Sequence, residues 1–265
     1  MQMFKSPQKA FQSDDWLGLL SFIAIVGLWL VSLIKLITIP VLELPWIWLV
    51  LAILGRSYLH TGLFIIAHDS MHSNLIPRDR RLNDILGNIA VTIYGFLPYA
   101  HCRKNHTAHH RFPSQSGDPD FHGSISHPLF WYCKFIREYF PLRSLIIFLI
   151  NMSIIFWGLV FFCNISLVNL LLVWIVPLVI SSLQLFYFGT YLPHRQIYNN
   201  PDFSPRLERS AYWIFWSFVS CYNFGRYHWE HHEYPMTPWY RLPNRHLQNT
   251  PLKVLPAVAT KCVRT

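Results

Sequence analysis

The sequence predicts an all-α integral membrane protein with about four transmembrane helices, further interfacial or re-entrant helices, and a histidine-ligated metal site on one side of the membrane. Three observations support this prediction. Hydrophobic residues make up 52% of the chain and charged residues only 13%, whereas an ordinary soluble domain carries about 25% charged residues. Several long runs lack any charged side chain, and histidines recur in three clusters beside those runs.

Length and composition argue against other classes of protein. The 265 residues contain no linker, internal repeat or low-complexity tract, so residues 1–265 are expected to form a single domain. The net charge is +9, but the basic residues do not form the dense stripe that nucleic-acid binding needs. The five cysteines include no CxxC pair, and their odd number argues against a disulfide framework or a zinc knuckle. The start of the chain lacks the features of a secretory signal, so we expect uncleaved spans.

The first two predicted spans form a pair. Residues 16–34 are uncharged and long enough to cross a hydrocarbon core of about 30 Å. The return span, residues 41–67, ends at the first histidine cluster but contains Arg56. A charge at mid-membrane costs roughly 2.5–3.5 kcal/mol on insertion scales. We therefore expect a long helix that overshoots the core and lifts Arg56 towards the cytoplasmic surface.

The segment 85–100 is apolar but short for a span. Topology also argues against a crossing, because the first two histidine clusters can meet only if both lie on one side of the membrane. An in-plane or re-entrant segment satisfies this condition. Residues 117–120 (Gly-Asp-Pro-Asp) predict a turn. Residues 121–143 are amphipathic and aromatic, which suits the membrane interface.

The second pair of spans lies in residues 144–194, which contain no charged side chain. This stretch divides at Asn164 into predicted spans 145–163 and 167–192, the second of which presents His194. Residues 210–225 are again uncharged but short, and are expected at the interface.

Charge placement predicts the orientation. All but Lys35 and Arg56 of the 22 Lys and Arg residues fall on the side that also holds the histidine clusters. Because positive loops stay in the cytoplasm, both termini and the metal site are expected there.

The three histidine clusters have helical spacing. His68 and His72 form an i, i+4 pair, while residues 106–110 and 228–232 each form an i, i+3, i+4 triplet, and such positions share one helix face. Neutral imidazole binds iron, copper, zinc and nickel, and the few thiolates disfavour iron–sulfur and structural zinc sites. Too many ligands are present for one ion, so we predict two metals, with four or five nitrogens each and positions left for oxygen, as in a di-iron oxidase. The predicted ligands are His68, His72, His106, His109, His110, His194, His228, His231 and His232.

The remaining histidines and the nearby acids receive other roles. Single histidines are more often structural, an interpretation that applies to His60, His101, His122, His127 and His246. Metal-bound imidazoles usually donate their second N–H to a carboxylate or a carbonyl. The candidates for this supporting role are Asp69, Asp118, Asp120 and Glu230, although Asp118 and Asp120 could equally cap a turn.

The three clusters and their topology resemble the membrane fatty acid desaturase and hydroxylase superfamily. Further stretches are similar to its β-carotene ketolase branch, known from bacteria and cyanobacteria, over about residues 15–245; they are residues 61–72, 81–84, 118–122, 181–194, 231–235 and 238–240. The chain departs from the family pattern at Ser70 and Ser73 near the first cluster. It also departs at Arg226, which is inserted before the third cluster, and at Thr190, where related desaturases carry Asn.

The resemblance implies a non-haem di-iron enzyme that oxidises the C4 methylene of a β-ionone ring to a ketone with O2. No nucleotide-binding motif such as GxGxxG is present, so electrons would come from a partner, expected to be a ferredoxin-type donor. Within the class, a carotenoid hydroxylase or an acyl-lipid desaturase is the alternative. Outside it stand a membrane haem protein and a transition-metal carrier, although a carrier should place its ligands near mid-membrane.

Overall fold

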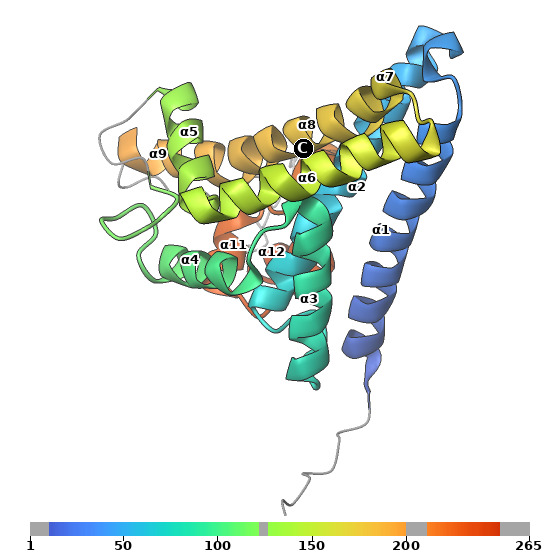
Figure 1. The fold of residues 1–265 in the computed structure, drawn as a ribbon. Coiled ribbons are helices and arrows are strands. Elements are labelled where there is room, and N and C mark those ends of the chain that lie inside the picture. The colour runs from blue at the N-terminus through green and yellow to red at the C-terminus, as the bar shows by residue number, and fades with distance from the viewer. Residues whose placement is uncertain (1–10, 122–126, 200–210, 250–265) are drawn as a thin grey trace, which may run out of the picture.

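The computed structural model describes residues 11–121, 127–199 and 211–249, and all regular structure within these ranges is helical. Figure 1 shows the long helices crossing one another above a cluster of shorter helices, α4, α11 and α12. The predicted fold class, an all-α membrane protein, is confirmed. Four helical segments are long and apolar enough to cross a membrane.

These four candidate spans are close to the predicted ones. They comprise α1 (Ser13–Thr38), α2 (Trp46–Met71), α6 (Leu142–Cys163) and the segment Leu167–Arg195. The last segment is built from α7 (Leu167–Leu170), π-helix η2 (Leu171–Ile175), α8 (Val176–Gln184), π-helix η3 (Leu185–Tyr191) and the start of α9 (Leu192–Asn199). Only 6% of the apolar window of α6 is buried, so most of its surface is available to lipid.

The ends of these spans follow from local chemistry. The second span begins at Trp46 rather than at the predicted Val41, because Val41–Glu43 forms a 3-10 turn, η1, and Pro45 caps α2. Proline lacks an N–H and is tolerated only where a helix starts. Asn164 ends α6 in the left-handed conformation, with φ of 52°, a conformation that Asn accepts more readily than most residues. The predicted division at Asn164 is therefore confirmed.

Arg56 meets protein rather than lipid. Its side chain is 1% exposed, and its Nε donates to the Val173 carbonyl at 3.0 Å. Its Nη1 donates to the Trp29 carbonyl and to Ser32 Oγ, and the guanidinium lies over the Trp29 ring. Arg56 thus joins α2 to α1 and η2. That α2 lifts Arg56 towards the membrane surface stays a prediction.

The segment 85–100 is not a single helix. Helix α3 (Arg80–Gly95) and helix α4 (Tyr99–Arg111) meet at an angle of 100°. The break contains Phe96, with φ of 54°, and Pro98, which caps α4. Such a bent pair is either a broken span or a re-entrant loop, so the in-plane or re-entrant segment stays a prediction. The bend returns the second histidine cluster to the end of α2.

Helix α3 packs closely along the end of α2. Ser70 Oγ donates to the Asn83 carbonyl at 2.7 Å and lies 2.6 Å from the Tyr99 hydroxyl. A Cβ atom at Gly87 would lie 2.2 Å from Ser70 Oγ, so only glycine fits this contact. Ser70, one of the departures from the family pattern, therefore forms part of the joint between α2, α3 and α4.

Shorter helices complete the region around the histidines. They are α5 (Pro128–Tyr139), α10 (Ala211–Cys221), α11 (His228–Glu233), the 3-10 turn η4 (Trp239–Arg241) and α12 (Leu242–Asn249). Helix α10 is described from Ala211 to Cys221, and the interfacial position of residues 210–225 stays a prediction.

Candidate metal centre

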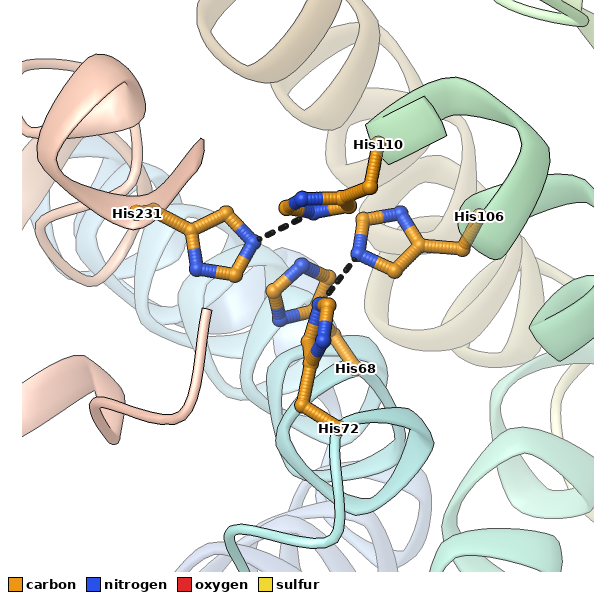
Figure 2. A group of neighbouring side chains, drawn as sticks. All are labelled: His68, His72, His106, His110 and His231. Atoms are coloured by element: carbon orange, nitrogen blue, oxygen red, sulfur yellow. Dashed lines mark hydrogen bonds between the residues drawn. The ribbon is translucent and has the colours of Figure 1, made fainter. Parts of the chain in front are cut away.

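The nine predicted metal ligands lie together, in two groups. The first group contains His68, His72, His106, His110 and His231, and the second contains His109, His194, His228 and His232. Within each group the potential ligand atoms lie within 4.8 Å of one another. Figure 2 shows the five rings of the first group facing a common centre. The groups adjoin, because the rings of His110 and His232 have centroids 4.3 Å apart.

The helices divide each triplet between the two groups. His106 and His110 face the first group, whereas His109, between them in sequence, faces the second. In the third cluster His231 joins the first group, while His228 and His232 join the second. The geometry of a helix explains this, because residues i and i+4 are about 40° apart around the axis and residue i+3 lies about 60° to the other side of i.

The distances between nitrogens fit metal ligands better than hydrogen-bonded histidines. In the second group a chain of Nε2 atoms joins His194 to His228 at 2.9 Å, His228 to His232 at 3.0 Å and His232 to His109 at 3.0 Å. An imidazole nitrogen carries either one hydrogen or one lone pair. His228 and His232 cannot therefore donate and accept along this chain with the same nitrogen. A cation that accepts all four lone pairs resolves the conflict.

The first group has the same character. His72 Nε2 lies 2.7 Å from His106 Nε2, and His110 Nε2 lies 2.9 Å from His231 Nε2. Two nitrogens bound to one ion at about 2.1 Å and at right angles lie about 3.0 Å apart.

Burial lowers the pKa of His72 to about 4, and burial also lowers the pKa values of His228, His231 and His232. These imidazoles are neutral at pH 7, the form that binds metals.

Asp118 orients the second group through His109. Its Oδ1 lies 2.9 Å from His109 Nδ1, and its Oδ2 accepts the Ser114 N–H at 2.8 Å. Burial acts to raise the pKa of Asp118, but the contact with His109 outweighs it and lowers the pKa. Burial likewise acts to lower the pKa of His109, but Asp120 and Asp118 outweigh it and raise that pKa. An ionised Asp118 holds the proton of His109 on Nδ1 and leaves Nε2 free as a ligand, an arrangement common in metal sites.

The other three acids differ in position. Asp120 Oδ2 lies 3.8 Å from His109 Nδ1, and burial raises the pKa of Asp120 to about 6. Asp69 Oδ1 lies 3.7 Å from His68 Nδ1, while its Oδ2 accepts the Trp239 N–H at 3.1 Å and so ties the first cluster to the loop after the third. Glu230 is half-buried on α11 and lies near Tyr227.

The structural histidines are separate from both groups. His60 accepts a hydrogen bond from Trp29 Nε1 at 3.0 Å and pairs with the Tyr94 carbonyl through Nε2. His101 contacts the Glu138 carbonyl, and His127 caps α5. The side chains of His122 and His246 lie outside the described ones. Of the five histidines interpreted as structural, the three described ones thus have partners elsewhere.

Two of the departures from the family pattern, Arg226 and Thr190, lie near the histidines, and the structure places each of them. Arg226 lies in a turn that begins at Tyr222 and Asn223, both with positive φ, and α11 starts only at His228. The inserted residue is absorbed by this turn and leaves the spacing within α11 unchanged. Thr190 is 3% exposed, on π-helix η3 and four residues before His194. It lines a small cavity beside the histidines.

Two cavities lie in this region, and the sequence did not show which residues line them. The small one, about 60 Å³, is lined by five histidines drawn from both groups. The other, about 400 Å³, is almost entirely apolar and lies between α2, α3, α5, α6 and α8. They share four lining residues, namely Phe64, Phe135, Tyr139 and Leu185. The many aromatic residues between 128 and 140 were the sequence signal that could have located the side of the cavity formed by α5.

Comparison with known proteins gives consistent matches. The family model described as "Fatty acid desaturase" matches residues 43–149 and 124–259. The chain is 37% identical over 203 residues to a "Beta-carotene ketolase" of Paracoccus sp. strain PC1, which covers 73% of the chain and 77% of the relative. It is 33% identical over 223 residues to a "Zeaxanthin 4-ketolase" of Chlamydomonas reinhardtii, covering 83% of the chain and 49% of the relative.

A third relative is the "Beta-carotene ketolase" of Haematococcus lacustris, with 34% identity over 200 residues, covering 71% of the chain and 59% of the relative. The chain thus spans about half of the length of the algal relatives and about three quarters of the bacterial one. No solved structure matches the chain.

Proposed function

The chain belongs to the fatty acid desaturase family, and on that premise we propose that it is a β-carotene ketolase. It oxidises the C4 methylene of a β-ionone ring to a ketone, giving echinenone and then canthaxanthin. The names of the three relatives support the substrate and the reaction. The carotenoid hydroxylase and the acyl-lipid desaturase remain the alternatives.

One observation carries the proposal: two groups of clustered histidines lie beside a small cavity that shares four lining residues with a large apolar cavity. Imidazole ligands without thiolates suit two non-haem iron ions. His68, His72, His106, His110 and His231 would hold one ion, and His109, His194, His228 and His232 the other. When bound, the irons supply the oxidising power from O2 that removal of hydrogen from an unactivated C–H bond requires.

The side chains around the irons perform the remaining tasks. Phe64, Phe135 and Leu185 offer apolar surface to the ring and exclude water from the space beside the histidines. Asp118 keeps His109 in the tautomer that binds through Nε2. The Tyr139 side chain hydrogen-bonds to Asp120, and both residues line the small cavity.

The overall stoichiometry follows from the carbon that is oxidised. Each of two hydroxylations at C4 uses one O2, two electrons and two protons, and releases one water. The resulting gem-diol loses a further water to give the ketone. All four electrons must come from outside the chain, since no nucleotide-binding motif is present.

Expression in a bacterial host that accumulates β-carotene tests the proposal. We expect new pigments whose masses correspond to one and two conversions of CH2 to C=O, resolved by chromatography and mass spectrometry. A His109→Ala variant should yield neither, whereas the matched His127→Ala variant should retain both, because His127 only caps α5. Hydroxylated carotenoids would instead indicate a hydroxylase, and newly unsaturated lipids with unchanged carotene a desaturase. Bound iron in the purified protein without a haem Soret band would support the di-iron site and exclude a haem protein.

The electron donor and the membrane orientation form a second part of the proposal. Lys104, Thr107 and Arg111 form the exposed stripe of α4, the helix that also carries His106, His109 and His110. Arg80 and Arg81 are exposed at the start of α3. This basic surface favours an acidic ferredoxin-type donor and a cytoplasmic position for the site.

A further inference from the structure

We propose that the apolar cavity is a one-ended lateral port: a carotenoid enters it from the lipid, one ring first, and leaves by the same opening. The identity of the ligand rests on the proposed function. The direction of entry rests on which ends of the cavity are closed and which are open.

The inner end of the cavity stops at the histidines. Phe64, Phe135, Tyr139 and Leu185 line both cavities, so the large cavity adjoins the small one at these side chains. Two of them, Phe135 and Tyr139, have ring centroids 4.9 Å apart, and Tyr139 is 6% exposed. The small cavity of about 60 Å³ has room for O2 or about two water molecules. A carotenoid ring does not fit there, so it stops at these side chains beside the metal centre.

The outer end opens on the lipid-facing side of the fold. Three of its lining residues are exposed, one on each of three helices: Cys133 on α5, Leu145 on α6 and Val179 on α8. The surrounding surface is apolar, with exposed Ile146, Leu149 and Leu183. Figure 1 shows α5 beside the N-terminal end of α6. Because lipid covers such a surface, the opening faces hydrocarbon.

The size of the cavity determines how much of the substrate it holds. A volume of about 400 Å³ is near the lower end of the 300–1,000 Å³ typical of pockets for drug-sized ligands. One ring and the beginning of the conjugated chain fit, and the rest of the carotenoid stays in the bilayer. The two rings of one molecule cannot occupy the site together. The monoketone must therefore leave, and a molecule must enter with its other ring, before the diketone forms.

Thiol labelling at the opening tests where the carotenoid binds. A Cys163→Ser, Cys262→Ser variant keeps Cys133 as its exposed thiol, beside the buried Cys102 and Cys221. The metal-loaded protein in lipid nanodiscs is treated with a small maleimide, with and without β-carotene. At about ten times its dissociation constant, carotene leaves about one site in eleven free, so labelling of Cys133 should slow about tenfold. Unchanged labelling would overturn the port.

The matched control moves the thiol away from the opening. Cys163 lies at the far end of α6 and is also exposed. In a Cys133→Ser, Cys262→Ser variant, β-carotene should leave the labelling of Cys163 unchanged. A bulky pyrene maleimide should stop ketone formation when attached to Cys133 but not when attached to Cys163. Full turnover with the bulky group on Cys133 would also contradict lateral entry at this point.

Isotope mixing tests whether the port has one end. Unlabelled β-carotene is converted in the presence of a small pool of isotopically labelled monoketone. Release between the two oxidations predicts that label enters the diketone in proportion to its share of the free monoketone. A diketone that forms without label would show that both rings react during one stay, and would overturn the one-ended port.

The two proposals fail in different ways. A chain that makes no ketone from β-carotene, yet whose Cys133 is protected by carotene, would refute the ketolase reaction and leave the port standing. Ketone formation with an unprotected Cys133 would refute the port and leave the ketolase standing.

Discussion

At the residue scale, the histidines show how far the sequence leads. All nine predicted ligands fall within the two groups, because helical spacing is enough to place residues on one face. The sequence did not predict how they are divided. That His109 separates from His106 and His110 depends on the orientation of α4 against α2 and α11, which is a property of packing. Asp118 could be named as a candidate from its proximity in sequence, but its contact with His109 Nδ1 required the structure.

Asp118→Asn tests the role of that contact. We expect the variant to fold but to bind the second metal more weakly, by about 10- to 100-fold in affinity or activity, as is typical when a carboxylate behind a histidine ligand is removed. The reason is that Asn can present an N–H to His109 and no longer favours one tautomer. Iron content per chain, measured after dialysis against a weak chelator, reports the effect. Glu43→Gln, in an exposed turn far from the histidines, is the matched control, and equal iron content in the two variants would contradict this role.

Arg56 gives a second prediction at the same scale. It makes hydrogen bonds to Val173, Trp29 and Ser32 from within the second span. Lysine has a single ammonium group and cannot reach both α1 and η2 in the same geometry. Arg56→Lys should therefore destabilise the protein by about 1.5–3 kcal/mol, the range for hydrogen bonds to charged groups. Thermal unfolding of the detergent-solubilised protein measures this, with the exposed Arg80→Lys as the control. A melting temperature equal to that of the control would show that the Arg56 contacts contribute little.

At the element scale, the composition predicted where the spans lie, but it did not predict where they end or bend, because these depend on local structure. Residues 144–194 divide at Asn164 as predicted. The start of α2 was misplaced, since Val41 is as apolar as the helix that follows Pro45. The 100° bend between α3 and α4 and the two π-helical stretches have no comparable signature. These irregular elements turn His194 and the second cluster towards the site.

The contact between α2 and α3 leads to a prediction for elements. In Gly87→Ala the new methyl group would meet Ser70 Oγ at 2.2 Å and Ser70 Cβ at 2.5 Å. We expect a loss of about 1–3 kcal/mol in stability, as for other overpacked contacts. Gly27→Ala is the matched control: nothing lies within 4 Å of its Cβ position, and alanine is the better helix former, so stability should hold or rise.

A second substitution identifies the cause of that loss. Ser70→Gly removes the two nearest of the three colliding atoms and leaves Tyr99 Cε2 at 2.8 Å, so Gly87→Ala should cost less in a chain that already carries Ser70→Gly. Thermal unfolding of the four chains in this cycle gives the coupling between the two sites. Additive losses would show that the collision is not the source of the effect.

At the scale of the whole molecule, the distribution of charge predicts how electrons arrive. Exposed basic residues on α3 and α4 lie on the elements that supply or support the histidines. If an acidic donor docks there, ketone formation with a reduced ferredoxin should fall steeply as salt rises, because added ions screen the attraction. Lys104→Glu with Arg111→Glu should lower the rate at low salt and flatten the salt dependence.

The control for this prediction keeps the charge change and moves it. Lys35→Glu alters a basic residue at the opposite end of α1, in its last turn, and should leave the salt dependence as it was. A rate that does not depend on salt in the unaltered protein would contradict docking by charge.

The composition of the two histidine groups also determines when a metal can first be held during biosynthesis. The first group draws on α2, α4 and α11, and needs His231; the second needs His228 and His232. The first set is complete only once residue 231 has left the ribosome and the second only after residue 232, when the four candidate spans of the described residues have been made. A nascent chain would therefore enter the membrane before either metal could be fully bound. Metal loading would then be a late event of maturation that joins α11 to α2 and α4.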